Sequence, residues 1–415
     1  MSKLIMAQEN GRIMGGPDKI FGVSTLAKKR IAEIGKENVV NSTIGALLDD
    51  DGNLIVLSSV IDVLKNLSPT DYAEYAPIAG TPEYLTTVKK AVFGNYQPTG
   101  YVEACATPGG TGAIRNAIQN YTKRGDIILT SDWHWSPYNI ITTEIERKLN
   151  TYTLFDENQN FNYSSLDQKL NEILKIQDET VIIINTPAHN PTGYTFTLED
   201  WDKVNEILKK AAEDKTKKIT LLVDIAYLDF SGDADEYREF FSKLEDFPDN
   251  VLVLIAFSTS KGYTLYGMRC GALLCLTPNK DIAEEFKMVA SFSSRGSWSN
   301  GTRASMVVLS QIFANENLLA KVTEERHKYL AILTKRGNAF MKAAKECNLK
   351  TCPFDSGFFI TIPCKNADQV GEELQKSNIF AVPIGAGIRI SIASISEEAC
   401  KMIPAKIAEA ISNVK

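Results

Sequence analysis

The strongest constraint on the fold is an unbroken apolar run from Val251 to Phe257, in which β-branched residues are frequent. Such a run is typical of a strand that is buried on both faces of a parallel sheet. Three hydroxyl residues and then Lys261 follow it directly. Open α/β sheets bind ligands at the carboxyl ends of their strands, where enclosure lowers the pKa of an amine and makes it a nucleophile. A single lysine in a strand-to-loop turn is, however, more often an ordinary solvated residue.

Apolar strands alternate with helical segments from about residue 100 onward, which predicts a mainly parallel sheet with helices on its faces. We expect helices at 112–123, 164–175, 198–213 and 280–290, and seven strands at 101–106, 126–130, 151–155, 180–186, 219–224, 251–257 and 271–276. After a long helical stretch, a smaller α/β region has strand candidates at 357–363, 379–384 and 388–393. The predicted fold class is therefore α/β, with a seven-stranded sheet in a large domain and a smaller α/β domain.

The composition, 44% hydrophobic and 23% charged, is ordinary for a globular protein. A net charge of −6 without a basic cluster disfavours nucleic acid as a partner. The opening residues lack the features of a signal peptide, and no apolar run approaches the roughly 18 residues of a membrane span. The seven cysteines are scattered without a CxxC pair, so we expect neither a disulfide framework nor a metal site. Together these features indicate the cytoplasm and no membrane partner.

A glycine-rich turn at 108–118, PGGTGAIRNAI, follows one predicted strand and opens a helix. Backbone N–H groups near Gly109, Gly110 and Thr111, with the helix dipole behind them, are suited to hold an anion. The turn does not fit a dinucleotide fingerprint, because Arg115 stands where the third glycine is required. A glycine turn into a helix is common, so this motif alone is weak support for a phosphate site.

Polar residues also follow two other predicted strands. Asn190 begins an Asn-Pro-Thr-Gly sequence just past one strand, and Asp224 ends the apolar run of another, with Tyr227 three positions on. A carboxylate at the end of a buried strand is costly unless a cationic group pairs with it. Taken singly, Asn190 is also explained as a turn residue and Asp224 as a helix cap.

These segments occur in a fixed order: glycine turn, Asn-Pro, Asp-x-x-Tyr, Ser-x-x-Lys, and Arg269 eight residues after Lys261. In this order they resemble the class I aminotransferases, which are pyridoxal-phosphate (PLP) enzymes of fold type I. The resemblance covers nearly the whole chain, and its closest motifs are those of aspartate aminotransferases. It implies an N-terminal arm and part of the small domain at 1–45, a large PLP-binding domain at 46–310 and a small C-terminal domain at 311–415.

The resemblance also implies roles for individual residues. Lys261 would hold PLP as a Schiff base and then carry the proton between the substrate Cα and the cofactor. Asp224 would pair with the pyridine nitrogen, while Tyr227 and Asn190 would bind the 3′ oxygen. Trp135 is preferred over Trp133 as the indole that stacks on the ring. The phosphate would be held by Gly110, Thr111, Ser258, Ser260 and Arg269.

The substrate residues are implied in the same way. Arg389 resembles the arginine that grips the α-carboxylate, and Gly45 the glycine beside it; Asn190 also contacts the substrate. Arg295, 34 positions after Lys261, matches the arginine that binds the distal carboxylate in aspartate aminotransferases. Its loop crosses the dimer interface in that family. Arg295, Ser299 and Tyr75 would therefore serve the partner subunit's site, which implies a homodimer with shared active sites.

The resemblance predicts transfer of amino groups between aspartate and 2-oxoglutarate by a ping-pong mechanism, with glutamate and oxaloacetate as products. Aromatic aminotransferases can keep the same distal arginine and swing it aside, so an aromatic or broad specificity is the alternative. A carbon–sulfur lyase or decarboxylase is a further alternative, followed by a non-catalytic PLP-binding regulator. Two residues depart from the animal-type pattern: Gly109 replaces a serine, and Tyr138 replaces a histidine behind Asp224.

Overall fold

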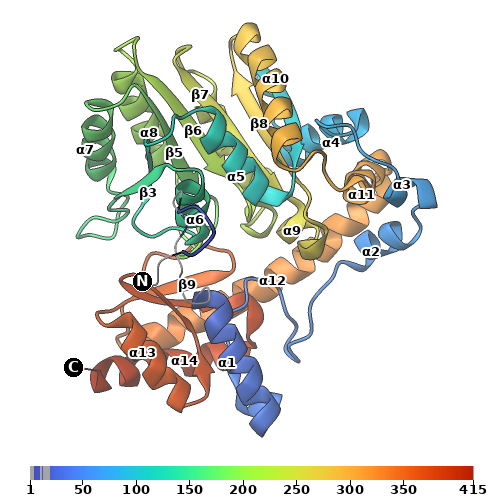
Figure 1. The fold of residues 1–415 in the computed structure, drawn as a ribbon. Coiled ribbons are helices and arrows are strands. Elements are labelled where there is room, and N and C mark those ends of the chain that lie inside the picture. The colour runs from blue at the N-terminus through green and yellow to red at the C-terminus, as the bar shows by residue number, and fades with distance from the viewer. Residues whose placement is uncertain (1–3, 10–11, 13–18, 415) are drawn as a thin grey trace. The chain divides into compact units, whose positions relative to one another are not determined.

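The computed structural model describes residues 4–9, 12 and 19–414 (Figure 1). Part of the predicted N-terminal arm, residues 1–3, 10–11 and 13–18, lies outside these residues. The chain forms two compact units. We call them the terminal unit (Met1–Ile55, Pro187–Thr195 and His327–Lys415) and the sheet unit (Val56–Thr186 and Phe196–Arg326). Their borders differ from the predicted domain borders at 45/46 and 310/311, which stay a prediction.

The sheet unit contains the predicted seven-stranded sheet, in the order β2-β8-β7-β6-β5-β3-β4. β8 runs antiparallel to both neighbours and the other pairings are parallel, so the predicted fold class is confirmed. The strands are β2 (Tyr101–Thr107), β3 (Ile127–Ser131), β4 (Lys148–Tyr152), β5 (Glu179–Asn185), β6 (Lys218–Asp224), β7 (Val251–Ser258) and β8 (Gly271–Thr277).

The predicted position of one strand was wrong by about three residues. The apolar segment 151–155 was expected to be a strand, but β4 begins at Lys148 and ends at Tyr152. Within the described residues β4 is the edge of the sheet and pairs with β3 alone, and its residues before Tyr152 alternate between exposed and half-buried. An edge strand does not need a continuous apolar run, and hydrophobicity alone therefore misplaces it.

The interior strands explain why the sheet is stable. Every residue of β7 and of β8 is buried, as expected of strands covered on both faces. One apolar cluster joins the sheet to α5 (Gly109–Asn120), α6 (Pro137–Glu144) and α10 (Lys280–Ser297). Further helices of the unit are α2 (Ser58–Lys65), α3 (Pro69–Ala73), α4 (Pro82–Phe93), α7 (Tyr163–Leu174), α8 (Leu198–Ala211), α9 (Thr259–Gly262) and α11 (Arg303–Ala314).

The terminal unit is built around a three-stranded antiparallel sheet in the order β11-β12-β9 and a two-stranded parallel pairing of β1 with β10. The run 379–384 was expected to be one strand. It is instead two short strands that join different sheets, because the chain changes partner at Ala381. The elements are α1 (Lys19–Ile34), β1 (Val40–Asn41), β9 (Phe359–Pro363), α13 (Ala367–Lys376), β10 (Ile379–Phe380), β11 (Val382–Ile384), β12 (Gly387–Ser391) and α14 (Glu397–Asn413).

The long helix α12 (Glu316–Glu346) contains the border between the two units, which falls after Arg326. No helix in the described part of the chain is long and apolar enough to cross a membrane.

Candidate active site

The carboxyl ends of three parallel strands bring the first site residues together. In register, Asn185 of β5 lies opposite Asp224 of β6, and Asp224 lies opposite Ala256 of β7. Lys261 follows three residues after the end of β7, in the short helix α9. Ligands of open α/β sheets bind at this edge, so the sheet topology by itself places an acid and an amine where a site is expected.

Asp224 is buried and has a defined set of partners. One carboxylate oxygen, Oδ2, accepts a hydrogen bond from the Tyr138 hydroxyl at 2.6 Å, and Oδ1 accepts one from the Ala226 N–H at 3.1 Å. Burial raises the pKa of this carboxyl, while the Tyr138 bond and the nearby Lys261 charge oppose the rise. A buried carboxylate held this way is ready to accept a cationic or N–H donor from a ligand.

Lys261 shares this enclosed environment. Burial lowers the pKa of its ammonium group; the Asp224 charge opposes the decrease and the Arg269 charge adds to it. Its Nζ lies 5.2 Å from the centre of the Tyr227 ring, and Tyr227 is itself buried. The structure therefore brings an amine with a lowered pKa, a carboxylate and a phenol together, as nucleophilic and proton-transfer chemistry requires.

A cradle for an anion lies at the start of α5. No side chain caps this helix within the described residues, and its first residue, Gly109, has φ +68°. A Cβ on Gly109 would lie 2.9 Å from Nη2 of Arg269, and one on Gly110 would lie 3.6 Å from Cβ of Ser258. The positive φ favours glycine at 109, and the absence of a Cβ lets the Arg269 guanidinium lie against this turn.

The aromatic residues of segment 133–138 have different surroundings. The Trp135 ring meets the Tyr138 ring edge-on, with centroids 5.5 Å apart, and packs against the core cluster on the sheet. Trp133 makes local bonds: its N–H donates to Asp132 and its carbonyl accepts from the Ser131 hydroxyl. His134 stacks on Tyr138 and is held by Ser131 and Asn139. Trp135 is therefore the indole that is next to the Asp224 partner.

In the terminal unit, Arg389 lies on β12 and is buried. Its Nη2 donates to the Thr43 carbonyl at 3.2 Å, and its Nη1 donates to Oδ1 of Asn190 at 3.4 Å. The guanidinium carbon of Arg389 lies 4.4 Å from the centre of the Phe359 ring. The same ring limits the size of the residue at position 45, since a Cβ on Gly45 would be 3.3 Å from Phe359. Arg389, Asn190 and Gly45 thus form one group, and a buried guanidinium fork of this kind suits a carboxylate.

Three of the predicted residues, Arg295, Ser299 and Tyr75, belong neither to the residues around Asp224 and Lys261 nor to the group around Arg389. Arg295 donates to the Ser299 hydroxyl at 2.7 Å, and Tyr75 is 84% exposed. Arg295 was expected in a loop but lies in the last turn of α10, which continues to Ser297. The serines and the glycine near this end weaken the helical pattern of the sequence, so the helix was predicted to end earlier. Thr111 and Ser260 lie in the first turns of α5 and α9.

One residue of the site was missed by sequence reasoning. Asn185 ends β5, is buried, and donates from Nδ2 to the Asp224 carbonyl at 2.7 Å. A polar residue closing an apolar strand was a signal that could have found it. Asn190 was predicted instead, because it belongs to a more distinctive motif.

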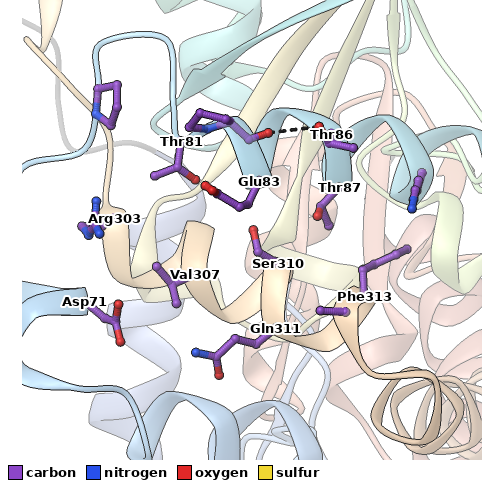
Figure 2. A pocket seen from close by; sticks show the side chains of 14 residues that line it. Asp71, Thr81, Glu83, Thr86, Thr87, Arg303, Val307, Ser310, Gln311 and Phe313 are labelled. Atoms are coloured by element: carbon purple, nitrogen blue, oxygen red, sulfur yellow. Dashed lines mark hydrogen bonds between the residues drawn. The ribbon is translucent and has the colours of Figure 1, made fainter.

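A pocket of about 830 Å³ lies elsewhere in the sheet unit, between α4 and α11 (Figure 2). Its lining is largely polar and includes Thr81, Glu83, Arg303 and Gln311, and Arg303 is paired with Glu74 at 3.1 Å. No predicted site residue lines it. Within the described residues, no group of three or more His, Cys, Asp or Glu side chains is arranged to hold a metal ion.

Known proteins are similar to this chain over most of its length. Residues 37–407 match the family model of Aminotransferase class I and II. The crystal structure of an aminotransferase from Anaerococcus prevotii DSM 20548 is similar, with a TM-score of 0.96 and 39% identity over 98% of this chain and 100% of that chain.

Two further relatives differ in the substrate that their names give. The mitochondrial aspartate aminotransferase of Xenopus tropicalis is 25% identical over 395 residues, which are 92% of this chain and 88% of that protein. The aromatic-amino-acid aminotransferase of Burkholderia pseudomallei, solved covalently bound to pyridoxal phosphate, has a TM-score of 0.78 and 22% identity, covering 98% of this chain and 100% of that chain.

Proposed function

Because this chain belongs to the class I and II aminotransferases, we propose that it transfers amino groups between aspartate and 2-oxoglutarate, with Lys261 as the covalent anchor of PLP. As a member of the family it is a PLP-dependent transaminase that acts on amino acids and 2-oxo acids. The observation that carries the proposal is the half-buried Lys261 amine, with its lowered pKa, beside the Asp224 carboxylate at the strand ends.

The residues of the sheet unit fit PLP. The space that a Cβ on Gly109 would fill lies against the Arg269 guanidinium, and Gly110 approaches Ser258, so the start of α5 presents N–H groups, a hydroxyl and a cation to one phosphate. Gly110, Thr111, Ser258, Ser260 and Arg269 would hold that phosphate. When bound, PLP supplies an electron sink for the bond that is broken at the substrate Cα.

The chain's own residues would do the remaining work. Lys261, with its lowered pKa, would move a proton to and from the substrate Cα. Asp224, held by Tyr138, would keep the pyridine nitrogen protonated. Tyr227 and Asn190 would donate to the 3′ oxygen, and Trp135 would pack on the ring.

For the substrate, the proposal rests on two guanidinium groups. Arg389 is buried and offers its fork to the α-carboxylate, with Gly45 and Asn190 beside it. Arg295 would bind the distal carboxylate in the partner subunit's site. Tyr75 would reach the cofactor phosphate there and Ser299 would also serve the cofactor, so we propose a homodimer with shared active sites. The exposure of Tyr75 supports this role, because a large aromatic side chain on a surface is typical of an interface. We keep the cytoplasm as the proposed location.

The second candidate is an aromatic or broad-specificity aminotransferase. Arg295 is exposed and is hydrogen-bonded to Ser299, so the structure leaves it room to move aside for an uncharged side chain. The similarity to an aromatic-amino-acid aminotransferase favours this alternative equally at the level of the fold. Substrate choice therefore depends on Arg295.

Arg295→Leu separates the two candidates. We expect kcat/KM for aspartate to fall by about 100-fold, the scale for a charge pair that loses one partner, and kcat/KM for phenylalanine to change by less than about threefold. Arg124→Leu, which removes another arginine with an exposed side chain paired to Glu146, is the matched control. Equal losses for aspartate and phenylalanine would refute the distal-carboxylate role.

A further inference from the structure

A buried cluster of three charges lies against Gly262, the residue that follows Lys261, and is not explained by the reaction. The Asp229 carboxylate accepts from Nη2 of Arg238 at 2.9 Å and is paired with Nη1 of Arg326 at 2.8 Å. The three side chains are only 7–12% exposed. Burial raises the pKa of Asp229, but the two arginines outweigh burial and hold it below its ordinary value. We call these residues the Asp229 cluster.

The Asp229 carboxylate fills the space beside the residue after Lys261. A Cβ on Gly262 would lie 2.0 Å from Oδ2 of Asp229, far inside any real contact. Position 262 must therefore be glycine while Asp229 is present. The short 3₁₀ helix that contains Asp229, Leu228–Phe230, begins directly after Tyr227 and contacts α9. The Asp229 carboxylate thus sets the separation between the segment that contains Tyr227 and the segment that contains Lys261.

The two arginines fix this carboxylate to the rest of the sheet unit. Arg238 donates from Nε to the Val92 carbonyl at 2.9 Å and from Nη2 to the Ala91 carbonyl at 3.1 Å, at the end of α4. The guanidinium of Arg326, from α12, lies 5.2 Å from the centre of the Tyr263 ring, two residues after Lys261. Groups of the cluster therefore lie against the two residues that follow Lys261, which are Gly262 and Tyr263.

We propose that Asp229 is a positioning residue: clamped by Arg238 and Arg326, it holds the backbone at Gly262 so that the Lys261 amine faces Asp224 and Tyr227. A buried ion cluster is weak support for stability, because desolvation of the charges offsets their attraction. A cluster with one carboxylate and two guanidiniums, packed against a glycine that it makes obligatory, is better explained by the geometry it fixes. This inference rests on the proposed role of Lys261.

Two variants test the inference on PLP-loaded enzyme. Asp229→Asn keeps the size of the side chain and removes its charge, whereas Gly262→Ala keeps the charge and removes the space. In both, we expect the rate at saturating aspartate to fall by at least about tenfold, with the half-saturating aspartate concentration changed by less than about threefold, because the misplaced amine affects proton transfer more than binding.

A spectroscopic readout separates positioning from a loss of folded protein. In Asp229→Asn, the pH midpoint of the visible absorbance of bound PLP should move to lower pH by about half a unit, since a displaced Lys261 nitrogen loses part of the stabilisation that the Asp224 charge gives its protonated form. Glu245→Gln is the matched control: it weakens an acceptor for Thr99 and Gly100, and it should lower the melting temperature without moving the midpoint or the rate.

The outcomes distinguish this inference from the proposed function. Borohydride reduction and peptide mapping of the wild type must find PLP on Lys261; PLP on another lysine overturns the proposed anchor and the inference with it. If PLP is on Lys261 and both variants keep the wild-type midpoint and rate, the positioning role alone is wrong. Should Asp229→Asn not fold, Gly262→Ala decides the question by its rate alone.

Discussion

We expect Lys261→Ala to abolish the covalent capture of PLP and to lower the transamination rate by at least about 10⁴-fold, the upper range for positioned acid–base catalysis. The physical reason is that Lys261 is the half-buried amine whose pKa is lowered at the strand ends, beside Asp224. No water or neighbouring hydroxyl can replace an amine that must both bind an aldehyde and move a proton.

The measurement is the visible absorbance of the PLP-loaded protein before and after borohydride, together with the steady-state rate. Lys209→Ala is the control, because that lysine is exposed on α8 and pairs with Asp246. The control should keep both the absorbance and the rate. Unchanged, borohydride-fixable absorbance in Lys261→Ala would show that the anchor is elsewhere.

The second large effect is expected for Asp224→Asn. Loss of the carboxylate should lower kcat by about 10³-fold, the scale for removing one preorganised electrostatic partner from a water-excluded site. An amide can still accept from the Tyr138 hydroxyl, so the local packing is kept while the charge that would hold the proton on the pyridine nitrogen is lost. Steady-state kinetics at saturating substrate measures the effect.

The same substitution should not destabilise the PLP-free protein at neutral pH. Burial raises the folded-state pKa of Asp224 above its ordinary value of 3.8, so ionisation costs the folded state stability as the pH rises from 3.8 through the folded pKa. Asparagine does not ionise and avoids that cost. The melting temperatures of the wild type and the variant should be compared near pH 4 and near pH 7. At the higher pH the variant should melt at the same temperature as the wild type or at a higher one. A large loss of stability at pH 7 alone would contradict a functional role for the charge.

The sequence predicted the interior of the sheet unit well because the signal there is strong. Strands such as β7 are buried on both faces, and this demands an uninterrupted apolar run that ends where the site begins. Parallel pairing then places Asp224 and Lys261 at one edge without further information. The start of the edge strand β4 and the split between β10 and β11 were not predicted, because exposure and a change of partner leave no trace in hydrophobicity.

The parts of the site that escaped prediction depend on contacts between distant segments. Asn185 was found only when the register set it against Asp224. The Asp229 cluster joins residues separated by up to 97 positions in the chain, as Asp229 and Arg326 are (326 − 229), and no spacing rule relates them. In the sequence, Gly109 stands only as the replacement of a serine and its hydroxyl. The structure adds that the Arg269 guanidinium lies against this position.

The most direct test of the account is a half-reaction with a single amino acid. PLP-loaded protein mixed with aspartate, and without any 2-oxo acid, should lose its visible absorbance and release one oxaloacetate per site; 2-oxoglutarate should then restore the absorbance. Aspartate and glutamate should react at least about 100-fold faster than phenylalanine, as expected when a charged group reads the distal carboxylate. A spectrum that aspartate leaves unchanged while phenylalanine converts it would contradict the proposed substrate.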